Sequence, residues 1–126
     1  MNYRYSRNYN PPAPIIEVTF LNVTENLKTE SLPAFIDTGA DGTIVPIEFL
    51  LQIEAPDTEK TIIRSPWGEE HEVSLFLVNI QLADLTIQEI EVVGDEISNE
   101  IILGRDVLNR LSVLLNGPEE LISVST

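Results

Sequence analysis

The chain has no cysteine, one histidine, and only 7 lysine and arginine residues among 126. Without cysteine, disulfide bonds and a thiol nucleophile are excluded. One histidine is too few for an ordinary zinc site, so we expect no metal and no cofactor. The net charge of −14 opposes contact with phosphate backbones and anionic lipids, so we expect no nucleic-acid partner and no membrane partner.

Long apolar runs are also absent, and none approaches the roughly 18 residues that a membrane-spanning helix requires. Residues 1–7 lack the apolar core of a secretory signal peptide. We therefore expect a cytoplasmic protein. Hydrophobic residues make up 43% of the chain, and its length of 126 residues indicates one globular domain.

Residues 1–14 differ in composition from the rest, because they are rich in tyrosine, asparagine, arginine and proline and show no hydrophobic period. We predict a flexible N-terminal tail. The alternative is an arm that docks on a partner subunit. Residues 15–126 are predicted to form the folded domain.

From residue 15 onward the sequence is typical of short β-strands. Ile16, Val18 and Phe20 alternate with polar residues, as in a half-buried strand. Further strands are expected over residues 30–36, 58–64, 70–80, 86–93, 99–103, 112–115 and 121–125. Residues 46–52 and 105–111 predict two short helices. The expected fold class is mainly β.

The most informative segment is Asp37-Thr38-Gly39, which directly follows an apolar run and occurs once. It predicts a carboxylate on a tight turn at the end of a buried strand, where the protein rather than water controls its ionisation. Residues 101–104 repeat the order of apolar residues followed by glycine, and Arg105 comes next.

Together these segments resemble the retropepsin-like (retroviral-type, clan AA) aspartic proteases, and are closer to the single-domain form found in bacteria. The resemblance implies a small closed β-barrel that is half of a two-fold dimer, because each subunit of such an enzyme supplies one Asp-Thr-Gly. It also implies an acid protease, an endopeptidase in which two Asp37 carboxylates, one from each subunit, activate a water molecule. The implied partners are a second copy of the chain and a peptide or protein substrate.

Carried over to this sequence, the resemblance assigns roles around the turn. Asp37 is implied to be the catalytic acid and base, and Thr38 to brace the two loops across the dimer axis. Gly39 is implied to lie close to bound substrate. A glycine suits this position because a side chain would crowd a sharp turn.

Ala40 and Asp41 are implied to contact substrate in the same way. Asp41 is also implied to form a buried pair with Arg105, and loss of either partner of such a pair costs about 3–5 kcal/mol. Asp106 follows directly, and we interpret it as an acidic residue at a helix N-terminus, where the helix dipole favours it.

The hairpin around residues 62–71 occupies the place of the flap, which closes over substrate in the family. At its tip the implied substrate-binding residues are Pro66, Trp67 and Gly68. Retroviral flaps have glycine-rich tips, and this tip departs from that pattern. The predicted C-terminal hairpin around residues 116–118 is longer than the retroviral end, so the dimer interface need not match.

Two other hypotheses use the same residues. A catalytically silent domain of this fold would act as a dimerisation or peptide-binding module, although the intact Asp37 favours activity. Residues 37–48 also match part of an EF-hand calcium loop. Against calcium, Gly39 and Val45 replace two ligand side chains, and Pro33 disfavours the incoming helix.

Overall fold

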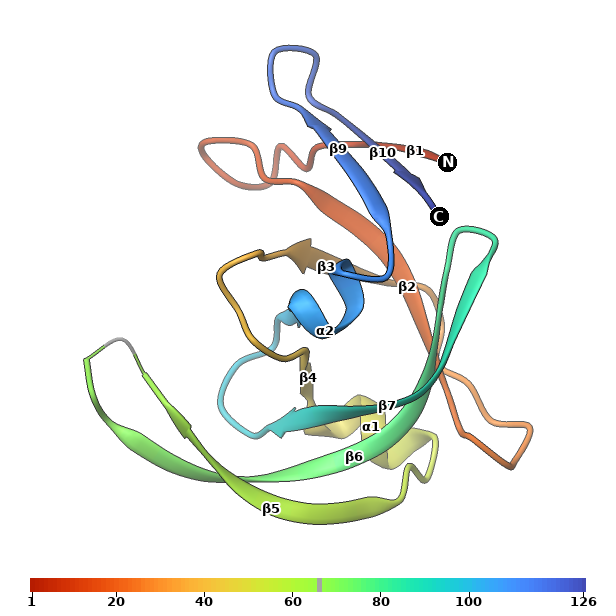
Figure 1. Ribbon diagram of the computed structural model, residues 1–126, viewed down its shortest axis with the longest axis vertical. Coiled ribbons are helices and arrows are strands. Elements are labelled where there is room, and N and C mark those ends of the chain that lie inside the picture. The colour runs from red at the N-terminus through yellow and green to blue at the C-terminus, as the bar shows by residue number, and fades with distance from the viewer. Residues whose placement is uncertain (66) are drawn as a thin grey trace.

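The computed structural model describes residues 1–65 and 67–126. In chain order the elements are β1 (Asn2–Arg4), β2 (Ile15–Leu21), β3 (Leu32–Ile36), β4 (Ile44–Pro46), α1 (Ile47–Gln52), β5 (Asp57–Arg64), β6 (Glu70–Leu82), β7 (Leu85–Asp95), β8 (Ile101–Leu103), α2 (Arg105–Leu108), β9 (Ser112–Asn116) and β10 (Leu121–Ser125). The predicted mainly β class with two short helices is confirmed (Figure 1). Across these two ranges, no helix has the length and apolar character needed to cross a membrane.

Six strands close into a barrel, as predicted. Their order is β2-β3-β8-β4-β7-β6, and β6 pairs again with β2. β5 continues the sheet beyond β6 and forms with it the long hairpin (Figure 1). Strands β3 and β8 are parallel neighbours, with Ala34 opposite Ile101. The two motif segments, which follow these strands, therefore leave the barrel at the same end.

The core lies inside the barrel, where the alternation expected for β2 is confirmed. Ile16, Val18 and Phe20 have essentially no exposed surface. Each helix adds apolar side chains to this core, among them Leu50 from α1 and Val107 from α2. Neither helix has a side-chain cap. Tertiary packing therefore holds these short helices in place.

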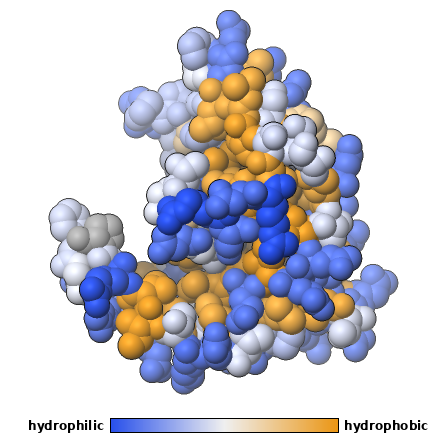
Figure 2. Space-filling model, in the orientation of Figure 1, coloured by the Kyte–Doolittle hydropathy of each residue, from blue (hydrophilic) through white to orange (hydrophobic). Residues whose placement is uncertain are grey.

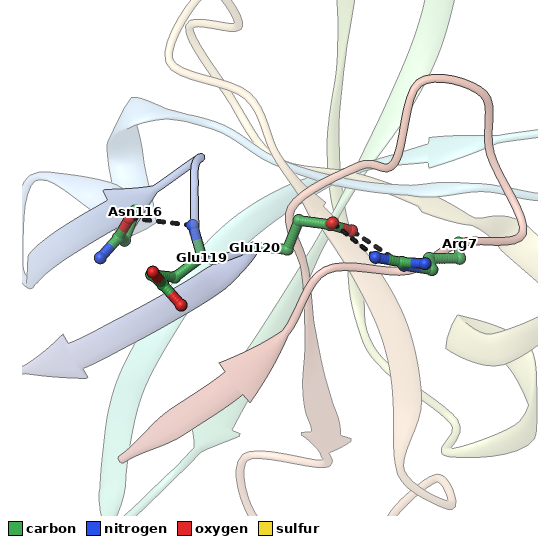
Figure 3. A network of polar contacts seen from close by, with 4 residues as sticks. All are labelled: Arg7, Asn116, Glu119 and Glu120. Carbon is green, nitrogen blue, oxygen red and sulfur yellow. Dashed lines mark hydrogen bonds and ion pairs between the residues drawn. The ribbon is translucent and has the colours of Figure 1, made fainter.

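The N-terminal segment differs from the predicted free tail, because β1 pairs with β10 in a three-stranded sheet, β1-β10-β9. The N-terminal ammonium group donates to the Val124 carbonyl oxygen at 2.8 Å. Arg7 donates two hydrogen bonds to Glu120 in the β9–β10 turn, at 3.1 and 2.7 Å (Figure 3). A three-residue strand is too short to show a hydrophobic period, which is why the sequence did not reveal it. The domain boundary at residue 14 stays a prediction.

Candidate active site

Asp37 lies in the turn directly after β3, and backbone groups orient it. Its own N–H donates to the Leu103 carbonyl oxygen of β8 at 3.1 Å. The Gly39 N–H donates to Asp37 Oδ1 at 2.9 Å. A Cβ at Gly39 would lie 3.2 Å from that oxygen, so the glycine leaves room for the carboxylate. Asp37 is exposed in the single chain, so the expected shielding of its carboxylate from water is not found there.

Arg105 joins the two motif segments. Its Nη1 donates to the Thr38 carbonyl oxygen at 2.8 Å, its Nη2 pairs with Asp41 Oδ1, and its backbone N–H donates to the Ala40 carbonyl oxygen at 2.9 Å. The implied Asp41–Arg105 pair is therefore present. The expected burial is wrong for the single chain, because the Asp41 side chain is 93% exposed and that of Arg105 45% exposed. An exposed pair of this kind contributes about 0–1 kcal/mol.

Thr43, which the sequence analysis did not single out, is fully buried beneath the turn. Its Oγ1 donates to Asp106 Oδ1 at 2.7 Å and accepts the Gly104 N–H at 3.1 Å. Its N–H donates to Asp106 Oδ2 at 3.1 Å, and its carbonyl oxygen accepts the Val93 N–H at 2.9 Å. Thr43 thus ties the turn to both α2 and β7. One threonine before an apolar strand carries no signal of such a role.

Asp106 lies in the first turn of α2, as predicted, and its Oδ1 also accepts the Val107 N–H at 2.9 Å. Asp106 also accepts hydrogen bonds from Thr43, which the helix-dipole argument did not predict. Because one carboxylate serves both the helix start and the turn, Asp106 fixes the position of α2 relative to the candidate catalytic loop.

Gly104 is required by a close approach of two backbones. A Cβ at this position would lie 2.5 Å from the Gly42 carbonyl oxygen and 3.0 Å from the Ala40 carbonyl oxygen. Real Cβ atoms do not approach backbone atoms so closely. The glycine in the second motif segment therefore allows that segment to pack directly beneath the first.

A groove of about 900 Å³ lies between the Asp-Thr-Gly turn and the arms of the β5–β6 hairpin. Asp37 and Asp41 line one side of it. Its apolar lining includes Ile44, Ile62 and Val93. Ile62 is 62% exposed, which is unusual for a residue of its size in the middle of a strand arm. The groove therefore offers carboxylates and apolar contacts side by side.

The tip of the hairpin carries the implied flap residues. Pro66 lies outside the described residues. Trp67 is 88% exposed, and Gly68 has a φ of 86°, a left-handed conformation that favours glycine. Ser65 supports the turn, because its carbonyl oxygen accepts the Gly68 N–H at 3.0 Å and its Oγ the Glu69 N–H at 3.1 Å. Neither Trp67 nor Gly68 lines the groove of the single chain.

Three solved structures are similar to this chain over most of its length. A retropepsin-like aspartic protease from Rickettsia conorii matches with a TM-score of 0.63 at 13% identity, covering 100% of this chain and 92% of the other. EIAV protease bound to an inhibitor matches with a TM-score of 0.60 at 22% identity, covering 86% of this chain and 93% of the other. The retroviral protease-like domain of Ddi1 from Leishmania major matches with a TM-score of 0.51 at 16% identity, covering 89% of each chain.

The chain has the retropepsin-like fold. No protein-family model and no curated protein sequence matches it. The likeness to the solved structures therefore establishes the fold and leaves the chemistry to be argued from the site.

Residues of the predicted tail support the candidate site from outside the barrel. Tyr9 packs edge to face on Phe35, with ring centroids 4.9 Å apart, and donates a hydrogen bond to Glu100 at 3.2 Å. Desolvation raises the pKa of Tyr9, and the hydrogen bond to Glu100 raises it further. Since Phe35 precedes Asp37 by two residues, the N-terminal segment braces the strand that carries the candidate catalytic residue.

The calcium-loop hypothesis is wrong for this chain. The segment that leads into Asp37 is strand β3, whereas an EF-hand requires a helix there. Among residues 1–65 and 67–126, no group of three or more histidine, aspartate or glutamate side chains is placed to hold a metal ion.

Proposed function

We propose that this chain is one half of an aspartic endopeptidase, which hydrolyses peptide bonds when two copies bring their Asp37 carboxylates together. The observation that best supports this proposal is the position of Asp37. Its exposed carboxylate lines a groove of about 900 Å³ that also has apolar walls. One chain offers one such carboxylate, whereas the reaction requires two.

In the proposed dimer, the two Asp37 carboxyl groups share one proton, because two carboxylates about 3 Å apart do not both ionise readily. The ionised carboxylate removes a proton from a water molecule, which attacks the peptide carbonyl carbon. The protonated carboxyl donates a hydrogen bond to the carbonyl oxygen, and a proton then passes to the leaving amine. The Gly39 N–H holds one Asp37 oxygen in place throughout.

Substrate positioning is assigned to groups around the same groove. Arg105 holds Asp41 by one oxygen, and the exposed carboxylate remains open to an N–H of a substrate backbone. Ile44, Ile62 and Val93 offer contacts to apolar side chains of an extended peptide. Ala40 lines the groove beside them.

The flap tip is proposed to cover the bound peptide. Trp67 and Gly68 belong to this cover, and Pro66 is assigned to it from the resemblance alone. The 88% exposure of Trp67 supports a contact partner, because a large aromatic side chain at a loop tip gains much from burial. As the only tryptophan, Trp67 also provides a fluorescence signal for peptide binding.

The test compares wild type with Asp37→Asn and with Asp84→Asn, an exposed aspartate in the turn between β6 and β7. Each protein is incubated with a denatured protein mixture at several acidic pH values, and the fragments are identified by mass spectrometry. We expect cleavage by wild type and Asp84→Asn, and less than about 1% of that rate for Asp37→Asn. Cleavage by Asp37→Asn near the wild-type rate would remove Asp37 as the catalyst.

Two further readouts complete this test. Specific activity is expected to fall on dilution, because mass action governs assembly of the shared site. Peptides that change the Trp67 fluorescence of wild type and Asp37→Asn alike, yet are never cleaved, would instead support the peptide-binding module.

A further inference from the structure

A second hollow lies beside the groove, between the β5–β6 hairpin and the loop that joins β7 to β8. Its volume is about 270 Å³, and Ile63 of β5 lines both the hollow and the groove. In Figure 2 the arm that carries the hairpin tip, at the left, stands apart from the rest of the molecule, and hydrophobic and hydrophilic surface lie side by side at its base. The hollow is therefore a side branch of the groove.

Aliphatic side chains from four elements form the apolar part of the hollow. These side chains are Ile47 of α1, Ile63 of β5, Val73 of β6 and Ile97 of the β7–β8 loop. Ile97 is 87% exposed. Asp95 fixes its position, because Asp95 Oδ1 accepts the Ile97 N–H at 2.9 Å and Oδ2 accepts the Ser98 N–H at 3.2 Å. The loop therefore holds a large apolar side chain at the edge of the hollow.

Negative charge outweighs positive charge in the same hollow. Three carboxylates line it, from Glu72, Asp95 and Glu96, together with one ammonium group, from Lys60. Lys60 Nζ lies 3.7 Å from Glu72 Oε1, and both side chains are 67% exposed. Such a long and exposed ion pair is weak. The carboxylates of the hollow are therefore open to a further cationic group.

This combination of apolar walls and carboxylates selects among the side chains of a peptide. An acidic side chain would be repelled by the three carboxylates. A purely apolar side chain would take water from the carboxylates without giving them a partner. Lysine and arginine have an aliphatic stem that packs on apolar walls and a cationic head that stays with charged groups or water. Of these classes, only the basic side chains match both parts of the hollow.

We propose that this hollow binds a lysine or arginine side chain of the peptide that lies in the groove. The inference rests on the proposed function for the position of that peptide. Apolar residues of the peptide would lie near Asp37, and the basic residue further along, where Ile63 joins groove and hollow. A two-fold dimer has two such hollows, so a basic residue is expected on each side of the cleaved bond. The net charge of −14 also attracts basic peptides.

The first experiment measures binding to the Asp37→Asn chain, so that no peptide is consumed. Labelled peptides carry a central pair of leucines, with lysine, arginine, glutamine or glutamate at successive distances on each side. Binding is followed by fluorescence anisotropy at fixed ionic strength. At one of these distances we expect lysine or arginine to bind about tenfold more tightly than glutamine, and glutamate most weakly. Equal binding of the basic and glutamine peptides at every distance, or no binding of any peptide, would overturn the inference.

The second experiment separates the hollow from the overall charge. The exposed carboxylates of Glu72 and Glu96 are replaced together by glutamine. The matched control is Glu25→Gln with Glu30→Gln, which removes the same charge from the exposed segment between β2 and β3, far from the hairpin tip in Figure 1. We expect the control to keep the preference for lysine over glutamine, and the hollow variant to reduce it to about twofold or less. An equal preference in both would show that net charge selects the peptide.

The third experiment tests the apolar walls with a shorter side chain of the same charge. Diaminopropionic acid replaces lysine in the peptide, and we expect about fivefold weaker binding because the contacts of the longer stem are lost. Ile97→Ser removes one wall and should reduce this difference. Leu51→Ser is the control, because Leu51 in α1 is also largely exposed, at 63%. An unchanged difference in Ile97→Ser would contradict the role given to the walls.

These readouts are independent of hydrolysis, and the hollow lies within one chain, so the two proposals can fail separately. If wild type cleaves protein while the basic and glutamine peptides bind alike, the inference fails and the proposed function stands. If the basic peptides bind more tightly through the hollow while no form of the chain cleaves protein, the hollow binds basic side chains and the proposed function fails.

Discussion

The floor of the groove, formed by Thr43, Gly104 and Asp106 beneath the Asp37 turn, and the β5–β6 hairpin hold their polar groups in opposite surroundings. In the floor, Thr43 has no exposed surface, and both hydrogen-bonding capacities of its hydroxyl are met by Asp106 and Gly104. In the hairpin, Arg64 and Glu70 pair at 2.6 Å, yet their side chains remain 70% and 52% exposed. A buried hydrogen bond is costly to break, because the separated donor and acceptor have no water molecule to bond with instead. Exposed ion pairs exchange readily with solvent.

This difference suits the proposed function. A catalytic carboxylate gains from a rigid support, and the floor holds Asp37 and its turn through contacts within one chain. A cover must open and close, and the exposed pairs of the hairpin change little in free energy when it moves. We therefore expect small substitutions in the floor to lower the free energy of unfolding strongly, and substitutions in the hairpin to change it little.

The largest effect on stability is expected for Gly104→Ala. Its new methyl group would meet the Gly42 carbonyl oxygen at 2.5 Å, and backbone on both sides cannot yield. We expect a loss of about 3 kcal/mol in the free energy of unfolding, measured with chemical denaturant. The matched control is Gly117→Ala, because a Cβ at Gly117 meets nothing within 4 Å. Equal costs for the two variants would contradict a tight floor.

Thr43→Val tests the hydrogen bonds of the floor at nearly constant shape. It removes the donor to Asp106 and leaves the buried Gly104 N–H without its acceptor. We expect a cost of about 2 kcal/mol in the free energy of unfolding. Thr43→Ser keeps the hydroxyl and should recover most of the hydrogen-bond contribution. A Thr43→Val chain as stable as wild type would show that packing alone holds the floor.

Arg105→Gln lies between the two regions, because its side chain is bonded to Thr38 and Asp41 but half exposed. We expect a cost of about 1 kcal/mol or less in the stability of the separate chain. Proteolytic activity should fall much further, since the loops beside Asp37 lose their common partner. A cost of several kcal/mol in the unfolding of the separate chain would contradict the small contribution expected of an exposed pair.

The smallest effect is expected for Arg64→Gln in the hairpin. Its pair with Glu70 is largely exposed, so the free energy of unfolding should change by no more than about 0.5 kcal/mol. The same variant measured in high salt should differ even less from wild type, because salt screens exposed charges. A loss as large as that of Thr43→Val would remove the distinction between floor and hairpin.

Some elements were predictable because their signals are local. The alternation of β2, the proline that precedes α1, and the long β5–β6 hairpin all depend on residues close together in the chain. The Asp37 turn was placed correctly for the same reason, since an apolar strand leads directly into it. The pairing of Asp41 with Arg105 followed from the resemblance, whereas its exposure did not, because exposure depends on what else covers the site.

The order of residues alone determined where most of the strands, turns and helices form, and it placed one candidate catalytic carboxylate in each chain. Only the tertiary structure decided that Thr43 is buried between Asp106 and Gly104, that β1 joins β10, and that β9 keeps an open edge. The reason is that local patterns limit the conformations of neighbouring residues, whereas burial and pairing arise between segments as far apart as Asn2 and Ser123. Such contacts exist only in the folded chain.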